Sequence, residues 1–168
     1  MIWLLRHTRV EIPAGICYGR SDLPLAITAM EDIEASLALL PPLGQARVIS
    51  SPAQRCMCLA RAISPEFTTD DRLLELDFGV WEGLAWNDVP REALDAWAAD
   101  IWGFAAPEGE TGTALLARVS GFWAATPERP LVIVAHGGPL RLLRQLAEGR
   151  APDLLEPPLG LGAVLRIG

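Results

Sequence analysis

The sequence predicts an α/β fold, a three-layer α/β/α sandwich with a mainly parallel central sheet. Short apolar runs stand at residues 2–6 (IWLLR), 47–50 (RVIS) and 131–135 (LVIVA). They do not alternate between apolar and polar residues, which is typical of strands that a parallel sheet buries on both faces. Helical signals separate these runs, and strands that alternate with helices favour this fold class. A last run at 163–167 (AVLRI) does alternate, and we expect an edge strand there.

Two helices are predicted from residues that cap a first turn. Thr28, followed three residues later by Glu31, has the pattern of a capping box. Apolar residues continue from there at helical spacing: Met30, Ile33, Leu37 and Leu40. Ser51 followed by Pro52 predicts a second helix, with serine as the N-cap and proline in the first helical position.

A third helix and two long connections complete the expected organisation. The glycine and proline at 138–139 open a helix that is expected to stop at Gly149. Residues 9–25 form a long loop that contains glycine and proline. Residues 84–114 are rich in tryptophan and partly helical, and we expect them to form a lid or excursion of one domain spanning 1–168.

Composition and charge exclude several classes of function. The chain has 168 residues, of which 51% are hydrophobic and 21% charged, as in a globular protein. The net charge of −7 argues against a general nucleic-acid or anionic-membrane surface. All fourteen basic residues are arginine. A cationic site must therefore be built from guanidinium groups, which favour bidentate contacts with oxyanions.

The sequence favours neither a metal centre nor export. Cys17, Cys56 and Cys58 lack the spacing of zinc ligands, and only two histidines accompany them. No stretch approaches the roughly 18 uninterrupted apolar residues that a membrane span needs. The first ten residues, MIWLLRHTRV, have no basic region before the apolar run and reach an arginine too early for a signal peptide. We therefore expect a cytoplasmic protein without metal or other cofactor.

The two histidines stand in matching places. His7 ends the first apolar run and His136 ends the run LVIVAH. Because ligands bind beyond the carboxyl ends of parallel strands, both imidazoles are expected in one crevice. Arg6 precedes His7, and Arg55 lies one turn into the helix that follows the second strand. The alternative is two independent, hydrogen-bonded core histidines and an arginine on a solvated helix face.

A helix N-terminus joins this group. The sequence HGGPLR places the start of a helix directly after His136, where free N–H groups and the helix dipole favour an anion. Two arginines, two histidines and a helix N-terminus describe a metal-free phosphate site. Neutral imidazole is also a good nucleophile toward phosphorus.

Hydrolysis also needs an acid to protonate the leaving oxygen. The segment 73–84 (LLELDFGVWEGL) offers Glu75, Asp77 and Glu82 beside aromatic residues and glycines. Periodicity does not choose among these three carboxyl groups.

Four ordered motifs carry a resemblance to a known family. LLRHT, SSPAQRC, ELDFGVWEG and VAHGGPLR resemble the motifs of the histidine phosphatase (phosphoglycerate mutase-like) superfamily. The resemblance implies that His7 is the phosphorylated nucleophile and that Arg6, Arg55 and His136 bind the phosphoryl group. With these roles, His7 must be neutral, and His136 is expected to be protonated to balance the phosphate charge. It also implies that Glu75 is the proton donor, with Asp77 and Glu82 as supporting residues.

The chain departs from the family pattern at three places. Thr8 stands where the family usually has glycine, Pro13 where many members have asparagine, and Leu59 where the second motif has threonine. The missing asparagine implies that one phosphate contact is lost or supplied elsewhere. APEGET at 106–111 resembles the family's PGGES segment, which precedes a helix near the site.

A shorter motif points to one branch of the superfamily. RHT followed by GICYGRSDLPL (15–25) resembles the α-ribazole phosphatases of cobalamin synthesis, which dephosphorylate α-ribazole 5′-phosphate. The resemblance implies that Tyr18, Arg20 and Asp22 lie near the mouth of the site as possible substrate-binding residues. The alternative is an ordered turn, since Asp-x-Pro suits turn chemistry.

Several alternatives stay open at this point. Four tryptophans in and just before the excursion are expected to serve packing rather than to stack on a substrate: Trp81, Trp86, Trp97 and Trp102. The substrate is expected to be a small phosphorylated metabolite, and a broad phosphatase of such metabolites is the main alternative. A non-catalytic phosphate-binding module is disfavoured because His7 and the carboxylate motif are both present. The oligomeric state is left open.

Overall fold

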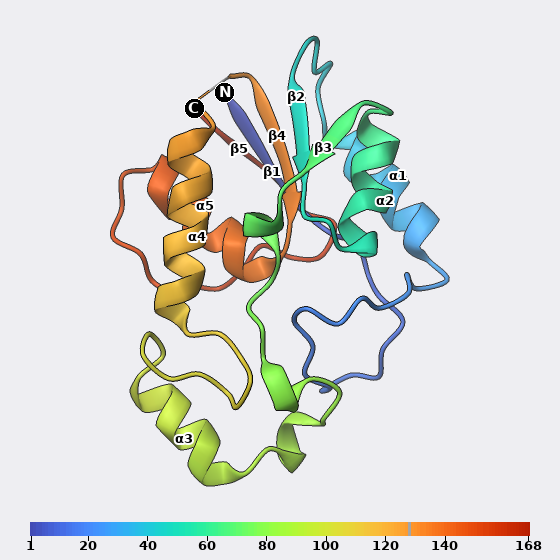
Figure 1. The fold of residues 1–168 in the computed structure, drawn as a ribbon. Helices are drawn as coiled ribbons and strands as arrows, with labels where there is room; N and C mark the ends of the chain where they lie inside the picture. The colour runs from blue at the N-terminus through green and yellow to red at the C-terminus, as the bar shows by residue number, and fades with distance from the viewer. Residues whose placement is uncertain (128) are drawn as a thin grey trace.

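The computed structural model describes residues 1–127 and 129–168. Within these residues, five strands form one sheet in the order β3-β2-β4-β1-β5 (Figure 1). Their bounds are Ile2–Arg6 (β1), Arg47–Ser50 (β2), Phe67–Thr69 (β3), Leu131–Ala135 (β4) and Val164–Ile167 (β5). The pairs β1–β4, β2–β4 and β2–β3 are parallel, and β5 pairs antiparallel with β1 at the edge. The predicted fold class is confirmed, and β3 is a strand that the sequence pattern missed.

Helices cover both faces of this sheet. Their bounds are Ala29–Ala38 (α1), Gln54–Ile63 (α2), Arg91–Ala99 (α3), Gly112–Ala125 (α4) and Gly137–Ala147 (α5). Short 3-10 helices lie at Asp71–Leu73, Gly79–Trp81 and Trp86–Asp88. Figure 1 shows α1 and α2 on one side of the sheet and α4 and α5 on the other. None of the helices in the described part of the chain is both long and apolar enough to cross a membrane.

Alternate residues of the central strands enter two separate cores. Ile2 and Leu4 of β1 pack into the cluster beneath α4 and α5, whereas Trp3 and Leu5 pack into the cluster beneath α1 and α2. Burial of each such side chain contributes about 1.5–3 kcal/mol to folding. This two-sided burial explains why these runs are continuously apolar rather than alternating.

Two of the expected helix starts are wrong in detail. Thr28 occupies the N-cap position of α1 but makes no side-chain capping hydrogen bond, and Met30 is 67% exposed instead of packed. The helix after Ser51 begins at Gln54, and its N-cap is Ala53. The backbone N–H of Gln54 donates to Asp22 Oδ1 at 2.9 Å, so a carboxylate from the 9–25 loop takes the capping role. Local patterns cannot reveal a cap supplied from 32 residues away.

The third helix follows its prediction. α5 begins at Gly137, directly after His136, and Gly149 adopts a φ of 66° just after its end. Glycine tolerates this left-handed conformation, which is the usual reason for a glycine stop.

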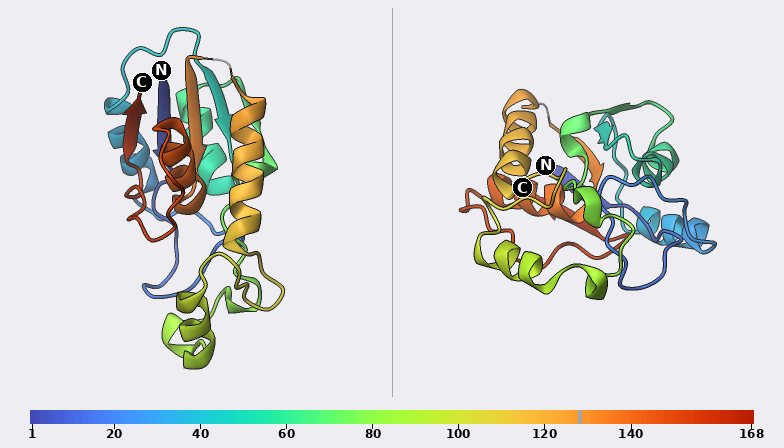
Figure 2. Two further views of the ribbon diagram at one scale, coloured as in Figure 1. Left: turned by 90° about the vertical axis from the view of Figure 1, so that its left-hand side faces the viewer. Right: turned by 60° about the horizontal axis from the view of Figure 1, so that its bottom comes forward.

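The 84–114 excursion packs on a small aromatic core that also includes Phe78 and Trp81. Trp81 and Phe104 stack with ring centroids 5.8 Å apart, and Trp86 and Trp97 stack at 6.0 Å. Trp102 packs instead against the main core beneath α4 and α5. The prediction that these tryptophans pack is confirmed. Figure 2 shows α3, which this core supports, beyond the edge at which β1 and β4 end.

Candidate active site

The two histidines follow neighbouring strands and meet at their carboxyl ends. Arg6 of β1 pairs with Ala135 of β4, so the next residue on each strand is a histidine. The His7 backbone N–H donates to the carbonyl of Ala135 at 3.1 Å, which keeps the two chains together beyond the ladder. The ring centroids of His7 and His136 lie 5.2 Å apart, with 61° between the ring planes. The expected convergence of the imidazoles is therefore confirmed.

His7 is held in one tautomer. Its Nδ1 lies 2.8 Å from the carbonyl oxygen of Thr8. Because a carbonyl oxygen only accepts, Nδ1 carries the proton and Nε2 keeps its lone pair in the neutral ring. Burial, together with the charges of Arg55 and Arg6, lowers the pKa of His7 to about 3 despite the opposing Thr8 hydrogen bond. His7 is therefore neutral near pH 7, as a nucleophile must be.

His136 does not fit the expectation of a protonated imidazole. Burial lowers its pKa well below the ordinary value, and the charges of Arg55, His7 and Arg6 act in the same direction. Its Nε2 forms a 2.8 Å hydrogen bond with Ser51 Oγ. The serine hydroxyl that the sequence suggests as a helix cap thus orients His136 instead. In this site His136 is a neutral hydrogen-bonding group, and a bound phosphate would raise its pKa.

Three guanidinium groups lie here without a carboxylate partner. Arg6 donates to the carbonyl of Leu159 at 2.6 Å, and the fully buried Arg55 donates to the carbonyls of Gly19 and Ser21. The third is Arg141 of α5. Among the described residues, no carboxylate lies within salt-bridging distance of any of the three, and each has a buried Nε without a hydrogen-bond partner. Such uncompensated positive charge suits an oxyanion.

Arg141 is a residue that sequence reasoning did not single out. It closes the motif VAHGGPLR and lies one turn after Gly137 on α5. It donates to the carbonyl of Leu154. Burial lowers its pKa, which the negative charge of Glu75 partly offsets. The i, i+4 spacing from the start of the helix was the available signal.

The structure separates the three candidate carboxylates. Glu75 Oε2 accepts from the backbone N–H of Gly138 at 3.2 Å, in the first turn of α5. Asp77 instead accepts from Gly79 N–H at 2.9 Å. Glu82 accepts from Arg20 N–H and Ser21 N–H; burial raises its pKa, but these and other hydrogen bonds hold it below the ordinary value. Glu75 is therefore the carboxylate that lies beside the histidine-bearing strand ends.

A buried ion pair braces the segment that carries Glu75. Arg118 of α4 binds Glu110 through two contacts of 2.7 and 2.9 Å, and these side chains are only 15% and 11% exposed. The same guanidinium donates to the carbonyls of Arg72, Leu74 and Glu75 at 2.6–3.0 Å. Glu110 belongs to the APEGET segment. These contacts fix the backbone of Glu75 from a helix more than forty residues away.

The three possible substrate-binding residues occupy different surroundings. Tyr18 lies beneath the Arg55 guanidinium, whose carbon is 5.5 Å from the ring centroid. Arg20 Nε lies 3.5 Å from the carbonyl of Glu75. Asp22 caps α2 as described above, which agrees with the alternative of an ordered turn. Contact of Tyr18, Arg20 or Asp22 with a substrate stays a prediction.

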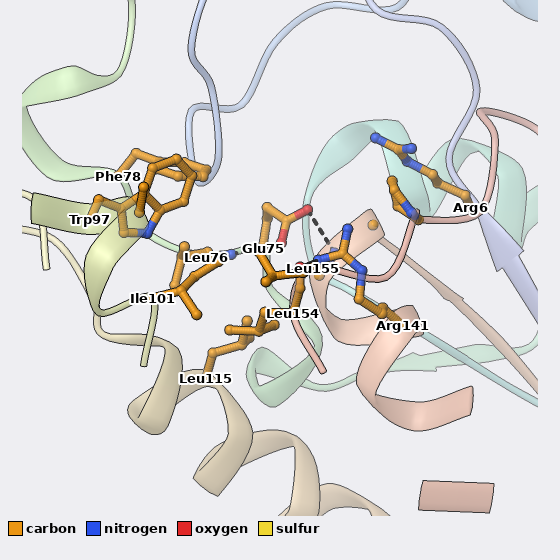
Figure 3. A pocket seen from close by; sticks show the side chains of 14 residues that line it. Arg6, Glu75, Leu76, Phe78, Trp97, Ile101, Leu115, Arg141, Leu154 and Leu155 are labelled. Carbon is orange, nitrogen blue, oxygen red and sulfur yellow. Dashed lines mark hydrogen bonds between the residues drawn. The ribbon is translucent and has the colours of Figure 1, made fainter. Parts of the chain in front are cut away.

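A cavity of about 430 Å³ lies next to this group. Arg6, Glu75 and Arg141 line one side of it, and Figure 3 shows Trp97, Phe78 and Ile101 on the other side. In the described part of the chain, no cluster of three or more His, Cys, Asp or Glu side chains is arranged to hold a metal ion. The arrangement brings together a neutral imidazole, uncompensated guanidinium groups and a carboxyl group.

Comparison with known proteins identifies the family of this chain. A family comparison matches residues 2–166 to the histidine phosphatase superfamily (branch 1). The chain belongs to this superfamily. The resemblance seen in the four motifs is thereby confirmed, and the match covers nearly the whole of this chain.

Relatives of this histidine phosphatase carry different names. The crystal structure of the α-ribazole phosphatase from Shigella flexneri superposes with a TM-score of 0.86 at 25% identity, covering 97% of this chain and 87% of that one. A glucosyl-3-phosphoglycerate phosphatase from Mycolicibacterium vanbaalenii is 28% identical over 168 residues, 89% of this chain and 75% of that protein. A bifunctional protein of Mycobacterium tuberculosis is 32% identical over 161 residues, 86% of this chain. This chain spans only 43% of the length of that bifunctional protein.

Proposed function

We propose that this protein is a metal-independent phosphomonoesterase that acts through a phosphohistidine intermediate on His7. The observation that carries the proposal is the state of His7. Its Nδ1 proton is held by the Thr8 carbonyl, so the Nε2 lone pair is available beside guanidinium groups that have no carboxylate partner. A neutral nucleophile among uncompensated cations suits attack on a phosphate dianion.

In the first step, His7 Nε2 attacks phosphorus and forms a P–N bond. The ester P–O bond breaks, and Glu75 donates its proton to the leaving oxygen. Arg6, Arg55 and His136 hold the equatorial oxygens.

In the second step, water attacks the phosphohistidine. Glu75, now a carboxylate, accepts a proton from that water as the new P–O bond forms. The P–N bond breaks and its electron pair returns to Nε2 of His7. Inorganic phosphate leaves, and both residues regain their starting states.

We propose α-ribazole 5′-phosphate as the substrate, in the assembly of the cobalamin nucleotide loop in the cytoplasm. The segment GICYGRSDLPL supports this assignment, and so does the likeness to the Shigella flexneri α-ribazole phosphatase. Tyr18, Arg20 and Asp22 of that segment are the proposed contacts with the substrate.

A second candidate is a broad-specificity phosphatase of small phosphorylated metabolites. The relative named glucosyl-3-phosphoglycerate phosphatase supports it, because its name points to a different ester on the same kind of chain. A non-catalytic phosphate-binding module is less well supported, because both His7 and Glu75 are present and lie at the same strand ends.

Phosphate release in EDTA tests the proposal, with α-ribazole 5′-phosphate measured beside sugar phosphates, nucleotides, phosphoglycerates and phosphohistidine. We expect a preference for α-ribazole 5′-phosphate of about 100-fold in kcat/KM, or about 2.7 kcal/mol of transition-state discrimination. Equal, weak activity across the panel would favour the second candidate. Absence of activity in the wild type, or equal activity in His7→Ala, would contradict the phosphohistidine mechanism.

A further inference from the structure

The cavity beside Glu75 has two chemically different sides. Nine of its fourteen lining residues are apolar or aromatic, and apart from the two glycines the others are Arg6, Glu75 and Arg141. Figure 3 shows the three charged side chains grouped together, with the apolar groups extending away from them. Its volume of about 430 Å³ falls in the range of small-molecule sites, which is about 300–1,000 Å³.

The apolar side offers little to a sugar or a glycerol chain. Its walls are Trp97, Ala98 and Ile101 from the region of α3, Leu115 from α4, and Leu154 and Leu155 from the segment after α5. Apart from the indole N–H, none of these side chains donates or accepts a hydrogen bond. Hydroxyl groups placed there would lose water without gaining partners, which is unfavourable.

The wall that α3 contributes is rigid. Trp97 stacks on Trp86 with 3° between the ring planes, and Phe78 meets its edge at 90°. These contacts fix the indole before any ligand arrives, so an aromatic ligand would lose less freedom on binding.

An apolar side chain at the rim of the cavity is exposed to water. Leu155 is 75% exposed although it lines the cavity. An apolar ligand that covers Leu155 would remove this apolar surface from water, which is favourable. A polar ligand would gain less free energy from the same contact.

We propose that this cavity binds a flat, apolar aromatic group carried by the alcohol that leaves phosphorus, with Ala98, Ile101 and Leu155 setting the preference. The proposal rests on the proposed phosphatase activity, since it takes Arg6 and Glu75 as the phosphate side of the cavity. It goes beyond that activity because it assigns a substrate class to named residues of this chain. Esters of small polar alcohols are accordingly poor ligands.

Binding of matched, non-hydrolysable phosphonates tests this without requiring turnover. The probes are 2-(1-naphthyl)ethylphosphonate and 3,4-dihydroxybutylphosphonate, which mimic an aromatic ester and glycerol 3-phosphate. We expect calorimetry on the whole chain to give a Kd about 30-fold or more lower for the naphthyl probe. Equal affinities, or tighter binding of the diol, would overturn the proposal.

Two variants locate the site. Ala98→Phe should fill the cavity and raise the Kd of the naphthyl probe by about 10-fold or more, while the Kd of the diol probe changes by less than about twofold. Leu155→Asn should raise the Kd of the naphthyl probe by about 3-fold to 10-fold. Leu39→Asn is the matched control, because Leu39 is also an exposed leucine but lies away from this cavity. Equal effects of Leu155→Asn and Leu39→Asn, or no effect of Ala98→Phe, would overturn the proposal.

The two proposals fail in different ways. Tight naphthyl binding without hydrolysis of any ester supports the cavity assignment and contradicts the phosphatase mechanism. Hydrolysis of α-ribazole 5′-phosphate with equal affinities for the two phosphonates supports the phosphatase mechanism and contradicts the cavity assignment.

Discussion

The strand-end group and the acid segment, which together form the site, are built in different ways. The strand-end group (Arg6, His7 and His136) follows two adjacent parallel strands, whose register places the histidines together. The acid segment, residues 72–77, contains no strand and is held by long-range contacts from Arg118 and Glu110. Regular structure positions the nucleophile, whereas individual side chains position the acid. The second region should therefore be easier to disturb without unfolding the protein.

Removal of the acid at Glu75 should have the largest effect on activity, and that effect should depend on the leaving group. Glu75→Gln should lower kcat for alkyl phosphates by about 10²-fold to 10⁴-fold, because the leaving alkoxide loses its proton donor. Release of dinitrophenolate needs no proton, so the first step with dinitrophenyl phosphate should be nearly unaffected. Rapid-quench kinetics with both esters measures this difference.

Asp77→Asn is the matched control for this experiment, since Asp77 lies on the same segment but accepts from Gly79 N–H. A similar loss in Asp77→Asn, or an equal loss with both esters in Glu75→Gln, would contradict the assignment of Glu75 as the acid.

Loss of the brace should have a smaller effect on activity. Arg118→Met leaves Glu110 with only the longer 3.6 Å pairing to Arg20 and removes the donor from the carbonyls of Arg72 and Leu74, so the free energy of unfolding should fall by about 2–4 kcal/mol. Because the acid then moves while the strand ends stay in place, kcat should fall by about 10-fold with little change in KM. Urea denaturation and steady-state kinetics measure the two effects.

Arg144→Met serves as the comparison, because Arg144 pairs with Glu148 and Glu156 on the more exposed surface of α5. It should change stability by less than about 1 kcal/mol and leave kcat unchanged. If Arg118→Met raised KM and left kcat intact, the brace would not act through Glu75.

The strand-end group should make stability depend on pH. The folded protein holds the pKa of His7 at about 3, below the ordinary 6.5, so the unfolded chain binds more protons between these values. The free energy of unfolding should therefore fall as pH is lowered from 7.5 to 5, by about 2 kcal/mol from His7 alone. His136 acts in the same direction. Urea denaturation at several pH values measures this dependence.

The chain offers a direct control, because it contains only two histidines. The double variant His7→Gln, His136→Gln should lose most of the slope between pH 5 and 7.5. An unchanged slope would show that the buried imidazoles are not its source.

The same contrast explains what could be predicted from sequence. Apolar runs that end in histidine predict the strands and the meeting of His7 with His136, because parallel strands end at one edge. The choice of Glu75 over Asp77 and Glu82 came only from the family resemblance, since the contacts that orient it come from distant residues. Arg141 was missed for a similar reason, because its role depends on the cavity that α3 and α4 close.

Short-range patterns also failed where a distant group replaced a local one. Asp22 caps α2 instead of Ser51, whose hydroxyl binds His136. β3 is only three residues long and lies at the sheet edge, so its sequence FTT shows neither a buried run nor a long alternation.

Detection of phosphate on His7 tests the central claim most directly. The Glu75→Gln variant is mixed with dinitrophenyl phosphate, quenched in alkali and analysed by mass spectrometry. The first step needs no acid with this ester, while the second step lacks its base, so phosphohistidine should accumulate on His7. Phosphate on His7, released slowly as the variant turns over, is the predicted result. Phosphate on another residue, or turnover with no covalent phosphate, would contradict the account.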